Sequence, residues 1–355
     1  MSYRVEIEPL GEIIEVEEGQ TILDAALRAG LYLPHACGHG LCSTCKVDVL
    51  EGEVDYGEAS PFALMDMERA EGKCLTCCSV PLSDLVIEAD VDEEPDAESY
   101  AVRDYVAVVT KIEQFTPRIK GIFLALEDDG LDFQAGQYLN INIPGLDSAP
   151  RAFSIASPPS SKNLIELNVA LIPGGEGTSY LHSDLNVGDE LSFSGPYGHF
   201  FVRTSAPEPK IFLAGGSGLS SPKCMVLDLL EKGDPSEVTL IYGARNQQEL
   251  YYRDLFEQMA RDHDNFHYVP ALSDESSDSD WQGARGFVHD VAHQHYNGKF
   301  EGNNAYMCGP PIMIDSCITT LMRGRLFEKH MYMENFYTNE SKDVKPKSPL
   351  FKGLG

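Results

Sequence analysis

The sequence has few basic residues for its length. Its 355 residues include 27 lysines and arginines against 56 aspartates and glutamates, and the formal net charge at pH 7 is −29. Such a surplus of negative charge repels nucleic acid and anionic membrane surfaces, because both are themselves negatively charged. The composition therefore argues against a nucleic-acid or membrane partner. It suits a protein partner with a basic surface, although the same charge also serves solubility.

Long hydrophobic runs are missing as well. No stretch of 18 apolar residues could span a membrane, and the chain does not open with a signal peptide. We therefore expect a cytoplasmic protein. In a reducing compartment, nine cysteines indicate metal or redox chemistry rather than disulfide bonds.

Six of the cysteines are clustered in two short stretches. Cys37, Cys42 and Cys45 have the spacing Cys-x4-Cys-x2-Cys, and Cys77 lies in the second stretch. This pattern resembles that of plant-type [2Fe–2S] ferredoxins, in which four thiolates hold two irons. Glycines within the loop let backbone N–H groups come close to the sulfides. The resemblance implies that these four cysteines are the cluster ligands.

Two alternatives remain open for these cysteines. Cys74 and Cys78 lie beside Cys77, so either is a candidate fourth ligand, although the Leu75-Thr76-Cys77 context resembles the last ligand of plant-type ferredoxins. The second alternative is a zinc site built from Cys42-x2-Cys45 and Cys74-x2-Cys77. We favour iron, because the zinc site leaves Cys37 unused and needs an unusually long segment between its halves.

The pattern of expected elements predicts several domains. Residues 1–92 combine short strands with a helix, which is typical of a small α+β ferredoxin domain of the β-grasp type, and residues 93–101 form an acidic linker. Short β-like runs between Gly and Pro turns over 102–206 predict an antiparallel β-barrel. Alternating strands and helices over 207–337 predict an α/β domain with a parallel sheet. The tail, 338–355, lacks periodicity and is expected to be disordered.

Local signals also predict where two helices of the first domain begin. Thr21, with Asp24 three residues later, is expected to cap a helix that ends at Gly30. Ser60 and Pro61 are expected to begin a second, short helix, because serine caps helices and proline fits their first position.

The middle domain carries a motif for a flavin. Arg151-Ala152-Phe153-Ser154 resembles the Arg-x-Tyr-Ser motif of the ferredoxin–NADP reductase superfamily. The resemblance implies that Arg151 binds diphosphate oxygens of FAD with its fork of N–H donors, and that the Ser154 hydroxyl lies beside the reactive part of the flavin ring. Phe153 keeps the stacking ring of the motif's tyrosine but lacks its hydroxyl, which puts any role of that hydroxyl in doubt.

Two later segments follow in the order of the same superfamily. Residues 175–181 resemble its Gly-x-x-Ser-x-x-Leu phosphate-binding segment, with Thr178 in the serine position, and residues 195–198 resemble its Gly-Pro-x-Gly turn. The resemblance adds Gly175, Gly177 and Thr178 to the residues expected to bind FAD.

A glycine-rich turn in the third domain joins a predicted strand to a predicted helix. The turn consists of Gly215, Gly216, Ser217 and Gly218. Exposed N–H groups in such a turn bind a pyrophosphate, and here Ser221 is expected to cap the helix, with Pro222 in its first turn. The turn resembles the Gly-Gly-Thr-Gly segment of the same superfamily, which implies a dinucleotide site.

Two segments near the end of the chain resemble the nicotinamide side of that superfamily. Cys308, Gly309 and Pro310 match its Cys-Gly-Pro-Pro motif, which implies that Cys308 lies where nicotinamide meets flavin. Phe336, in Glu334-Asn335-Phe336-Tyr337, is expected to cover the flavin face. For both Cys308 and Phe336, a purely packing role is the alternative. The catalytic candidates are therefore Ser154, Cys308 and Phe336.

The preference between NADH and NADPH depends on the end of the second strand of this domain. Tyr242-Gly243-Ala244-Arg245 resembles the superfamily's Tyr-Gly-x-Arg, and Glu249 follows it. A carboxylate here suits the ribose 2′-hydroxyl of NADH, whereas Arg245 suits the 2′-phosphate of NADPH. We expect NADH, with NADPH as the alternative.

The order of ferredoxin, FAD-binding and NAD-binding domains resembles the reductase components of bacterial multicomponent oxygenases. The Gly-Ser-Gly-Leu-Ser-Ser-Pro stretch resembles, within this group, the reductases of phenol hydroxylases and related soluble diiron monooxygenases. The resemblance implies electron transfer from NADH through FAD and a [2Fe–2S] cluster to a diiron hydroxylase. The alternatives are a Rieske dioxygenase partner or a redox-sensing module without catalysis.

Overall fold

The computed structural model describes residues 2–91, 94–127, 129–146 and 150–336. The chain divides into two compact units, one up to residue 103 and one from residue 104 onward. The expected disordered tail, 338–355, and Glu93 of the expected linker lie outside the described residues. Among the described residues, no helix is both long enough and apolar enough to cross a membrane.

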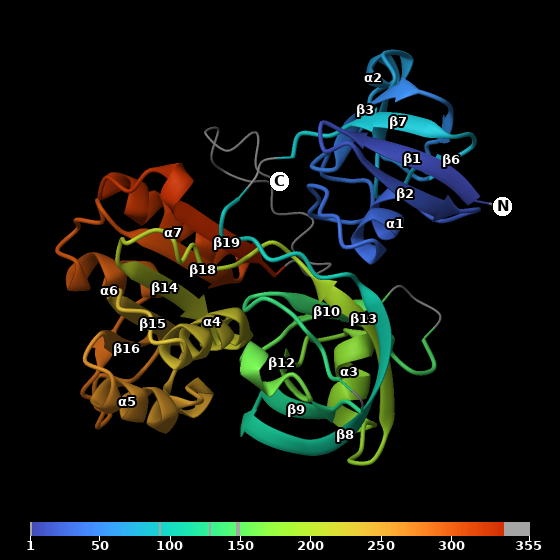
Figure 1. Cartoon of the computed structure of the whole chain (residues 1–355). Helices are drawn as coiled ribbons and strands as arrows, with labels where there is room; N and C mark the ends of the chain where they lie inside the picture. The colour runs from blue at the N-terminus through green and yellow to red at the C-terminus, as the bar shows by residue number, and fades with distance from the viewer. Residues whose placement is uncertain (1, 92–93, 128, 147–149, 337–355) are drawn as a thin grey trace. The chain divides into compact units, whose positions relative to one another are not determined.

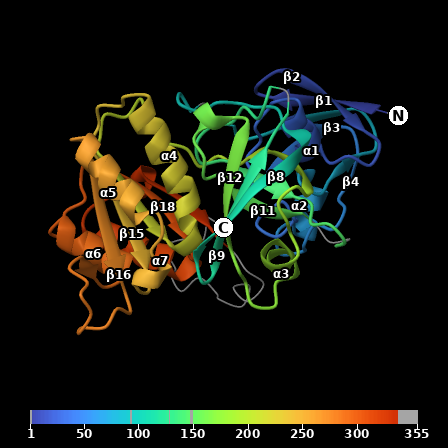
Figure 2. The same cartoon turned by 90° about the horizontal axis from the view of Figure 1, so that it is seen from below.

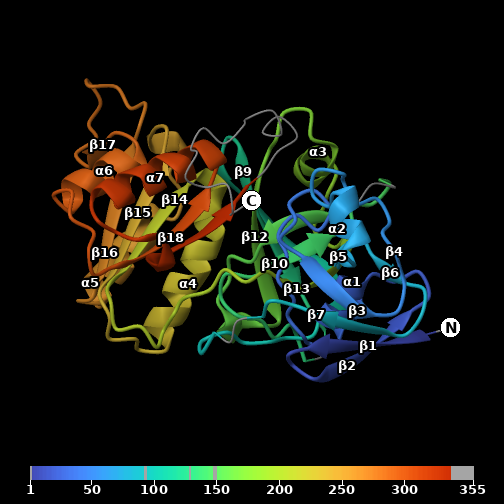
Figure 3. The same ribbon diagram turned by 90° about the horizontal axis from the view of Figure 1, so that it is seen from above.

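The first unit is built on a five-stranded mixed sheet in the order β2-β1-β7-β3-β5 (Figure 3). Its strands are β1 (Ser2–Glu8), β2 (Glu12–Glu17), β3 (Lys46–Glu51), β5 (Lys73–Leu75) and β7 (Leu85–Glu88), and β4 (Val54–Asp55) pairs with β6 (Val80–Pro81). Its helices are α1 (Ile22–Arg28) and α2 (Asp66–Ala70). Alternate residues of β1 and β2, such as Val5, Ile7 and Val16, point into one core with α1. The expected α+β ferredoxin fold is confirmed.

One of the two predicted helix starts in this unit is correct. The Thr21 hydroxyl accepts the N–H of Asp24 at 3.3 Å and caps α1. The prediction at Ser60 is wrong, because Ser60 begins only a turn and α2 starts after Met65. There the Glu68 carboxylate accepts the N–H of Met65 at 2.9 Å, which supplies the cap that Ser60 was expected to give.

The second unit begins with a six-stranded antiparallel sheet in the order β11-β10-β13-β8-β9-β12. Its elements are β8 (Arg103–Thr116), β9 (Ile119–Ala125), β10 (Tyr138–Ile141), β11 (Arg151–Ser154), β12 (Leu164–Ala170), α3 (Glu176–Ser183) and β13 (Glu190–Tyr197). A bridge between Ile155 and Leu167 joins the chain after β11 to the opposite edge strand, β12. The sheet therefore curves until its two edges meet, as the predicted antiparallel barrel requires.

A six-stranded parallel sheet, in the order β17-β16-β15-β14-β18-β19, forms the rest of the unit. Its strands are β14 (Lys210–Gly215), β15 (Val238–Ala244), β16 (Phe266–Leu272), β17 (Ala284–Arg285), β18 (Asn304–Gly309) and β19 (Met331–Asn335). Its helices are α4 (Ser220–Glu231), α5 (Arg253–Asp262), α6 (Val288–His295) and α7 (Pro311–Arg323). Helices α4 and α5 cover one face of the sheet, and α6 and α7 cover the other (Figures 1 and 2). The expected α/β domain is confirmed.

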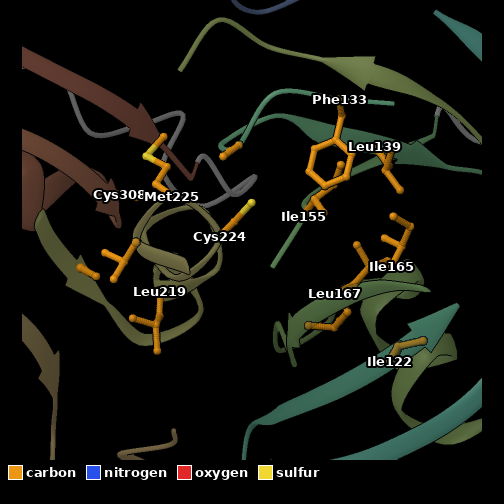
Figure 4. Packing of buried hydrophobic residues seen from close by; sticks show 14 of the residues in the cluster. Ile122, Phe133, Leu139, Ile155, Ile165, Leu167, Leu219, Cys224, Met225 and Cys308 are labelled. Atoms are coloured by element: carbon orange, nitrogen blue, oxygen red, sulfur yellow. The ribbon is translucent and has the colours of Figure 1, made fainter. Parts of the chain in front are cut away.

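The antiparallel and parallel sheets of the second unit share one hydrophobic core. Ile155 and Leu167 of the barrel belong to the same buried cluster as Leu219, Met225 and Cys308 of the α/β domain (Figure 4). This continuous packing fixes the two sheets relative to each other. A site formed by side chains from both domains is therefore defined in this unit.

Candidate functional site

The cysteine loop of the first unit, residues 37–45, and the later Cys77 bring four thiols together. The Sγ atoms of Cys45 and Cys77 lie 3.2 Å apart, and the Cys37 thiol interacts with those of Cys42 and Cys77. These contacts lower the pKa of Cys37 and raise the pKa values of Cys42 and Cys77, because the thiols donate to a shared thiolate. The contact with Cys77 likewise lowers the pKa of Cys45 to about 7. Such a set of thiols is able to bind iron or another soft metal once deprotonated.

Backbone N–H groups of the loop point at the same sulfurs. The N–H groups of His39 and Leu41 lie 3.4 and 3.3 Å from the Cys37 sulfur, and the Cys37 N–H lies 3.4 Å from the Cys42 sulfur. Gly40 has a φ of +72°, and a Cβ atom there would lie 2.6 Å from the Cys78 sulfur. The loop therefore depends on this glycine, and its thiols and inward N–H groups fit an iron–sulfur cluster.

The other two cysteines of the second stretch have different surroundings. Cys74 lies on β5 in the hydrophobic core, where burial raises the pKa of its thiol to about 12. Cys78 lies beside the four thiols, with its sulfur 3.6 Å from that of Cys77. Geometry thus separates Cys74 from the thiol group and leaves Cys78 next to it.

The middle domain brings its two phosphate motifs into contact. Arg151 begins β11 and Gly177 lies in the first turn of α3, where a Cβ atom would be 3.1 Å from Cγ of Arg151. The Thr178 hydroxyl accepts the N–H of Ile172 at 3.1 Å and donates to the carbonyl of Gly175 at 3.2 Å, so it shapes the turn. Among the described residues, no side chain caps the helix at Gly175. A guanidinium beside open helix N–H groups fits a diphosphate.

A carboxylate joins the serine and cysteine candidates. Glu334 Oε2, on β19, accepts the hydroxyls of Ser154 at 3.1 Å and Ser221 at 2.9 Å, and it lies 3.7 Å from the Cys308 sulfur. Burial raises the pKa of Glu334, and the three donors partly oppose that rise. Burial also raises the pKa of Cys308, and the neighbouring carboxylate adds to this rise. The arrangement orients the Ser154 hydroxyl toward a buried carboxyl group.

Two members of this cluster were missed at the sequence level. Glu334 lies in the segment that resembles the end of the reductase domain, but only Phe336 was proposed from it. The feature that could have revealed Glu334 is that it is the one acidic residue in an otherwise uncharged last strand. Ser221 was expected to cap α4, which is wrong. The short helical turn Gly216–Leu219 leads directly into α4, so Ser221 lies inside the helix and its hydroxyl bonds to Glu334 instead.

The glycine-rich turn and the cysteine–glycine–proline segment lie side by side. Strands β14 and β18 are parallel neighbours with Ala214 opposite Cys308, so both segments leave the sheet at the same edge. A Cβ atom on Gly218 would lie 2.4 Å from the Cys308 carbonyl oxygen, whereas one on Gly216 would meet no atom of the described residues within 4 Å. The turn is therefore tightly packed on its inner side and open at Gly216, as a pyrophosphate requires.

The remaining candidates also lie at this edge of the sheet. The Phe336 N–H donates to the Gly309 carbonyl at 3.1 Å, and its partly buried ring packs against the shared core. Glu249 forms an ion pair with Arg245, with 2.9 Å between Arg245 Nε and Glu249 Oε2. The two residues expected to bind the ribose end of the nucleotide therefore bind each other. A nucleotide that used either side chain would have to displace this ion pair.

Family models match all three domains of this chain. A 2Fe-2S iron-sulfur cluster binding domain matches residues 5–82, an oxidoreductase FAD-binding domain matches residues 107–202, and an oxidoreductase NAD-binding domain matches residues 212–318. The three matches confirm the expected [2Fe–2S], FAD and NAD(P)H-binding domains.

Two of the relatives match this chain over its full length. The reductase component DmpP of phenol 2-monooxygenase from Pseudomonas sp. (strain CF600) is 58% identical over 355 residues, 100% of both chains. The phenol hydroxylase P5 protein of Acinetobacter pittii (strain PHEA-2) is 54% identical over the same full length. Among solved structures, the Amycolatopsis reductase GcoB superposes with a TM-score of 0.85 at 31% identity, over 94% of this chain and 98% of that one.

Proposed function

Because this chain belongs to the family of phenol hydroxylase reductase components, we propose that its electron acceptor is the diiron hydroxylase of a phenol or related aromatic monooxygenase. The chain is an NAD(P)H-dependent oxidoreductase that transfers electrons from NADH through FAD and a [2Fe–2S] cluster. The observation that carries the proposal is the 58% identity over the full length of a phenol 2-monooxygenase reductase. We also propose that the protein works in the cytoplasm, where clustered cysteines indicate metal or redox chemistry.

The proposed diiron hydroxylase partner has better support than the two alternatives from the sequence, a Rieske dioxygenase partner and a non-catalytic redox sensor. A Rieske dioxygenase partner has weaker support, because the reductase of carbazole 1,9a-dioxygenase is 25% identical to this chain. A non-catalytic sensor has no need of the joined Ser154–Glu334–Cys308 cluster beside the open nucleotide turn. Both features belong to an enzyme that transfers electrons between bound cofactors.

The cysteine geometry supports Cys37, Cys42, Cys45 and Cys77 as the cluster ligands. Cys77 is favoured as the fourth because its sulfur lies 3.2 Å from that of Cys45, whereas Cys74 is enclosed in the core. When bound, the cluster supplies one-electron transfer, which the protein tunes through the N–H groups that point at its sulfurs.

We propose one group of residues in the second unit for binding FAD and another for binding NADH. The groups proposed to bind FAD are Arg151, Phe153, Ser154, Gly175, Gly177 and Thr178. The groups proposed to bind NADH are Gly215, Gly216, Ser217, Gly218, Glu249, Cys308, Gly309 and Pro310. Ser154, Cys308 and Phe336 are then the catalytic candidates, and Glu334 joins them because it holds Ser154 and Cys308 on one carboxylate oxygen.

Replacing Arg151 by alanine is expected to weaken FAD binding. Each charge-assisted hydrogen bond that is lost costs about 1.5–3 kcal/mol, which corresponds to a roughly ten- to hundredfold weaker affinity. The FAD content of the purified variant, measured by absorbance after dialysis, should fall. Arg118→Ala is the matched control, because Arg118 lies exposed in the turn between β8 and β9. Full FAD occupancy in the Arg151 variant would refute the diphosphate role.

The face around the cysteine loop supports docking to a protein partner. Leu41 and Phe62 are 60% and 97% exposed, and the Ser60 N–H ties the Phe62 segment to the Gly40 carbonyl at 3.0 Å. Apolar side chains beside the proposed redox centre, on a chain with a net charge of −29, suit a partner with an apolar patch rimmed by basic residues.

Electron delivery to the hydroxylase is expected to slow as ionic strength rises. Exposed charges are screened over about 8 Å at physiological salt, so a net charge of −29 steers a basic partner best at low salt. Stopped-flow mixing of NADH-reduced protein with the phenol hydroxylase component would follow cluster reoxidation from low to high salt.

The control is the reduction of bound FAD by NADH, which needs no protein docking and should change far less with salt. A reoxidation rate that is the same at all salt concentrations would show that the charge serves solubility and that docking relies on apolar contacts. No reoxidation by the hydroxylase at any salt concentration, with rapid reoxidation by a Rieske oxygenase, would overturn the proposed partner.

A further inference from the structure

A buried ion pair joins the barrel to the α/β domain. Nζ of Lys223, on α4, lies 2.6 Å from Oε2 of Glu166, on β12, and the two side chains are only 5% and 8% exposed. Removing two charges from water costs several kcal/mol per ion, and their attraction repays this only with good geometry and further hydrogen bonds. Stability alone is therefore a weak explanation for this pair.

Both charged groups have additional partners. Oε1 of Glu166 accepts the Tyr252 hydroxyl and the Asn168 amide, each at 2.6 Å. Lys223 also donates to the Ala156 carbonyl at 3.1 Å and lies 4.4 Å from the centre of the Tyr252 ring. The network is therefore directional, and it holds α4 and the segment around Tyr252 at one position along β12.

The same network leads to the Glu334 cluster from two sides. Ala156 lies two residues after Ser154, and Lys223 lies two residues after Ser221. The hydroxyls of Ser154 and Ser221 meet at Glu334 Oε2. A shift of α4 along the barrel would break the Lys223–Ala156 contact and would separate the two serines from their common acceptor.

The tyrosine side of the network reaches the nucleotide turn. Tyr252 has a φ of +60°, in the left-handed region that a tyrosine rarely adopts, and the neighbouring Tyr251 hydroxyl donates to the Gly216 carbonyl at 3.3 Å. Phe115 of the barrel stacks on Tyr251 with 5.4 Å between ring centres. Glu166 thus links the barrel, through Tyr252 and Tyr251, to the turn proposed for the pyrophosphate.

We propose that Glu166 and Lys223 are positioning residues for hydride transfer, which set the register between the flavin strand and the nucleotide helix. This inference rests on the proposed function, because it assigns the pair to the step in which NADH reduces bound FAD. Neither residue is among the groups proposed to bind FAD or NADH. It acts by holding Ser154, Ser221 and the Gly216 turn in one arrangement.

The test uses the full-length protein loaded with FAD and cluster, with the variants Glu166→Gln, Lys223→Met and the double variant Glu166→Leu with Lys223→Met. Lys232→Met is the control, because Lys232 pairs with Asp228 at the exposed far end of the same helix. Two measurements are made. Stopped-flow gives the maximal rate of FAD reduction and the apparent Kd for NADH, and hydrogen exchange without NADH reports on residues 154–157 and 220–224.

Both single variants are expected to lower the maximal rate about ten- to hundredfold, since misplacement by about 1 Å suffices for such a loss. The apparent Kd should change much less, FAD content should be retained, and both segments should exchange faster than in wild type. Lys232→Met should match wild type in every measurement.

The double variant distinguishes a positioning role of the ion pair from a contribution to stability alone. An apolar pair of similar volume is expected to restore the unfolding temperature to near the wild-type value, because replacing a buried ion pair in this way is often neutral or stabilising. The reduction rate should nevertheless stay low, because the directional contacts are gone. A wild-type rate in the double variant would overturn the proposal, as would wild-type rates and exchange in the single variants.

The double variant also decides the matter if the single variants fail to fold. Wild-type protein whose FAD is not reduced by NADH would contradict the reductase activity on which the inference rests. Unchanged exchange at 154–157 and 220–224 in the variants would refute the positioning role independently of that result.

Discussion

Replacing Cys42 by serine is expected to abolish the iron–sulfur absorbance bands and the reduction of cytochrome c by NADH. The Cys42 sulfur belongs to the group of four thiols and receives the N–H of Cys37, and a serine hydroxyl is a poor ligand where soft thiolates hold iron. Reduction of ferricyanide by NADH through FAD should persist, because the FAD and NAD domains form a separate compact unit. Absorbance spectra and the two acceptor assays measure these outcomes.

Variants of the neighbouring cysteines serve as controls and decide the fourth ligand. Cys77→Ser should lose the cluster as Cys42→Ser does. Cys78→Ala and Cys74→Ala should retain it, because Cys74 is enclosed in the core and Cys78 only borders the thiol group. A full set of bands in Cys42→Ser would show that Cys42 is not a cluster ligand. Loss of the bands in Cys78→Ala with retention in Cys77→Ser would exchange the two roles.

The sequence predicted the first three cysteines more firmly than the fourth for a physical reason. Cys37, Cys42 and Cys45 belong to one loop, so their spacing alone brings their sulfurs together. The position of Cys77 depends on β5 pairing with β3 in the register that sets Cys74 opposite Val47. That register points Cys74 into the core, and it arises from long-range strand pairing that local sequence does not encode.

The same limit explains why the sequence did not reveal Glu334 in the cluster with Ser154 and Cys308. Ser154 and Cys308 follow recognisable local motifs, but Glu334 reaches them because β19 pairs with β18 and sets Cys308 opposite Glu334. The sequence did not indicate that Glu166 and Lys223 form a buried pair, because isolated charged residues in a strand and a helix usually lie at the surface. Their burial follows from the packing of α4 on the closed barrel.

Replacing Glu334 by glutamine is expected to slow the reduction of bound FAD by NADH about ten- to hundredfold, as expected for hydrogen bonds to a charged acceptor worth about 1.5–3 kcal/mol. Glutamine has nearly the same shape, but it cannot carry the negative charge that a deprotonated Glu334 presents to the hydroxyls of Ser154 and Ser221. Stopped-flow reduction at saturating NADH gives the rate. Glu328→Gln is the control, because Glu328 is exposed just before β19.

The pH dependence gives this prediction a second, independent measurement. Burial raises the pKa of Glu334 in the folded protein above its value in the unfolded chain, so the folded state binds the proton more tightly. The associated stability is fully present below the unfolded pKa and is lost as pH rises through the folded pKa. Glutamine does not titrate. The unfolding temperature of the variant should therefore depend less on pH in this window and should equal or exceed that of wild type above it.

The reduction rate should respond to pH in the opposite direction. In wild type the rate should fall as pH is lowered through the raised pKa of Glu334, because the protonated carboxyl then resembles the glutamine side chain. In the variant the same profile should be flat at the low value. A variant that is reduced at the wild-type rate while retaining FAD would show that the Glu334 charge is not needed. The cluster around it would then contribute only to packing between β11, α4 and β19.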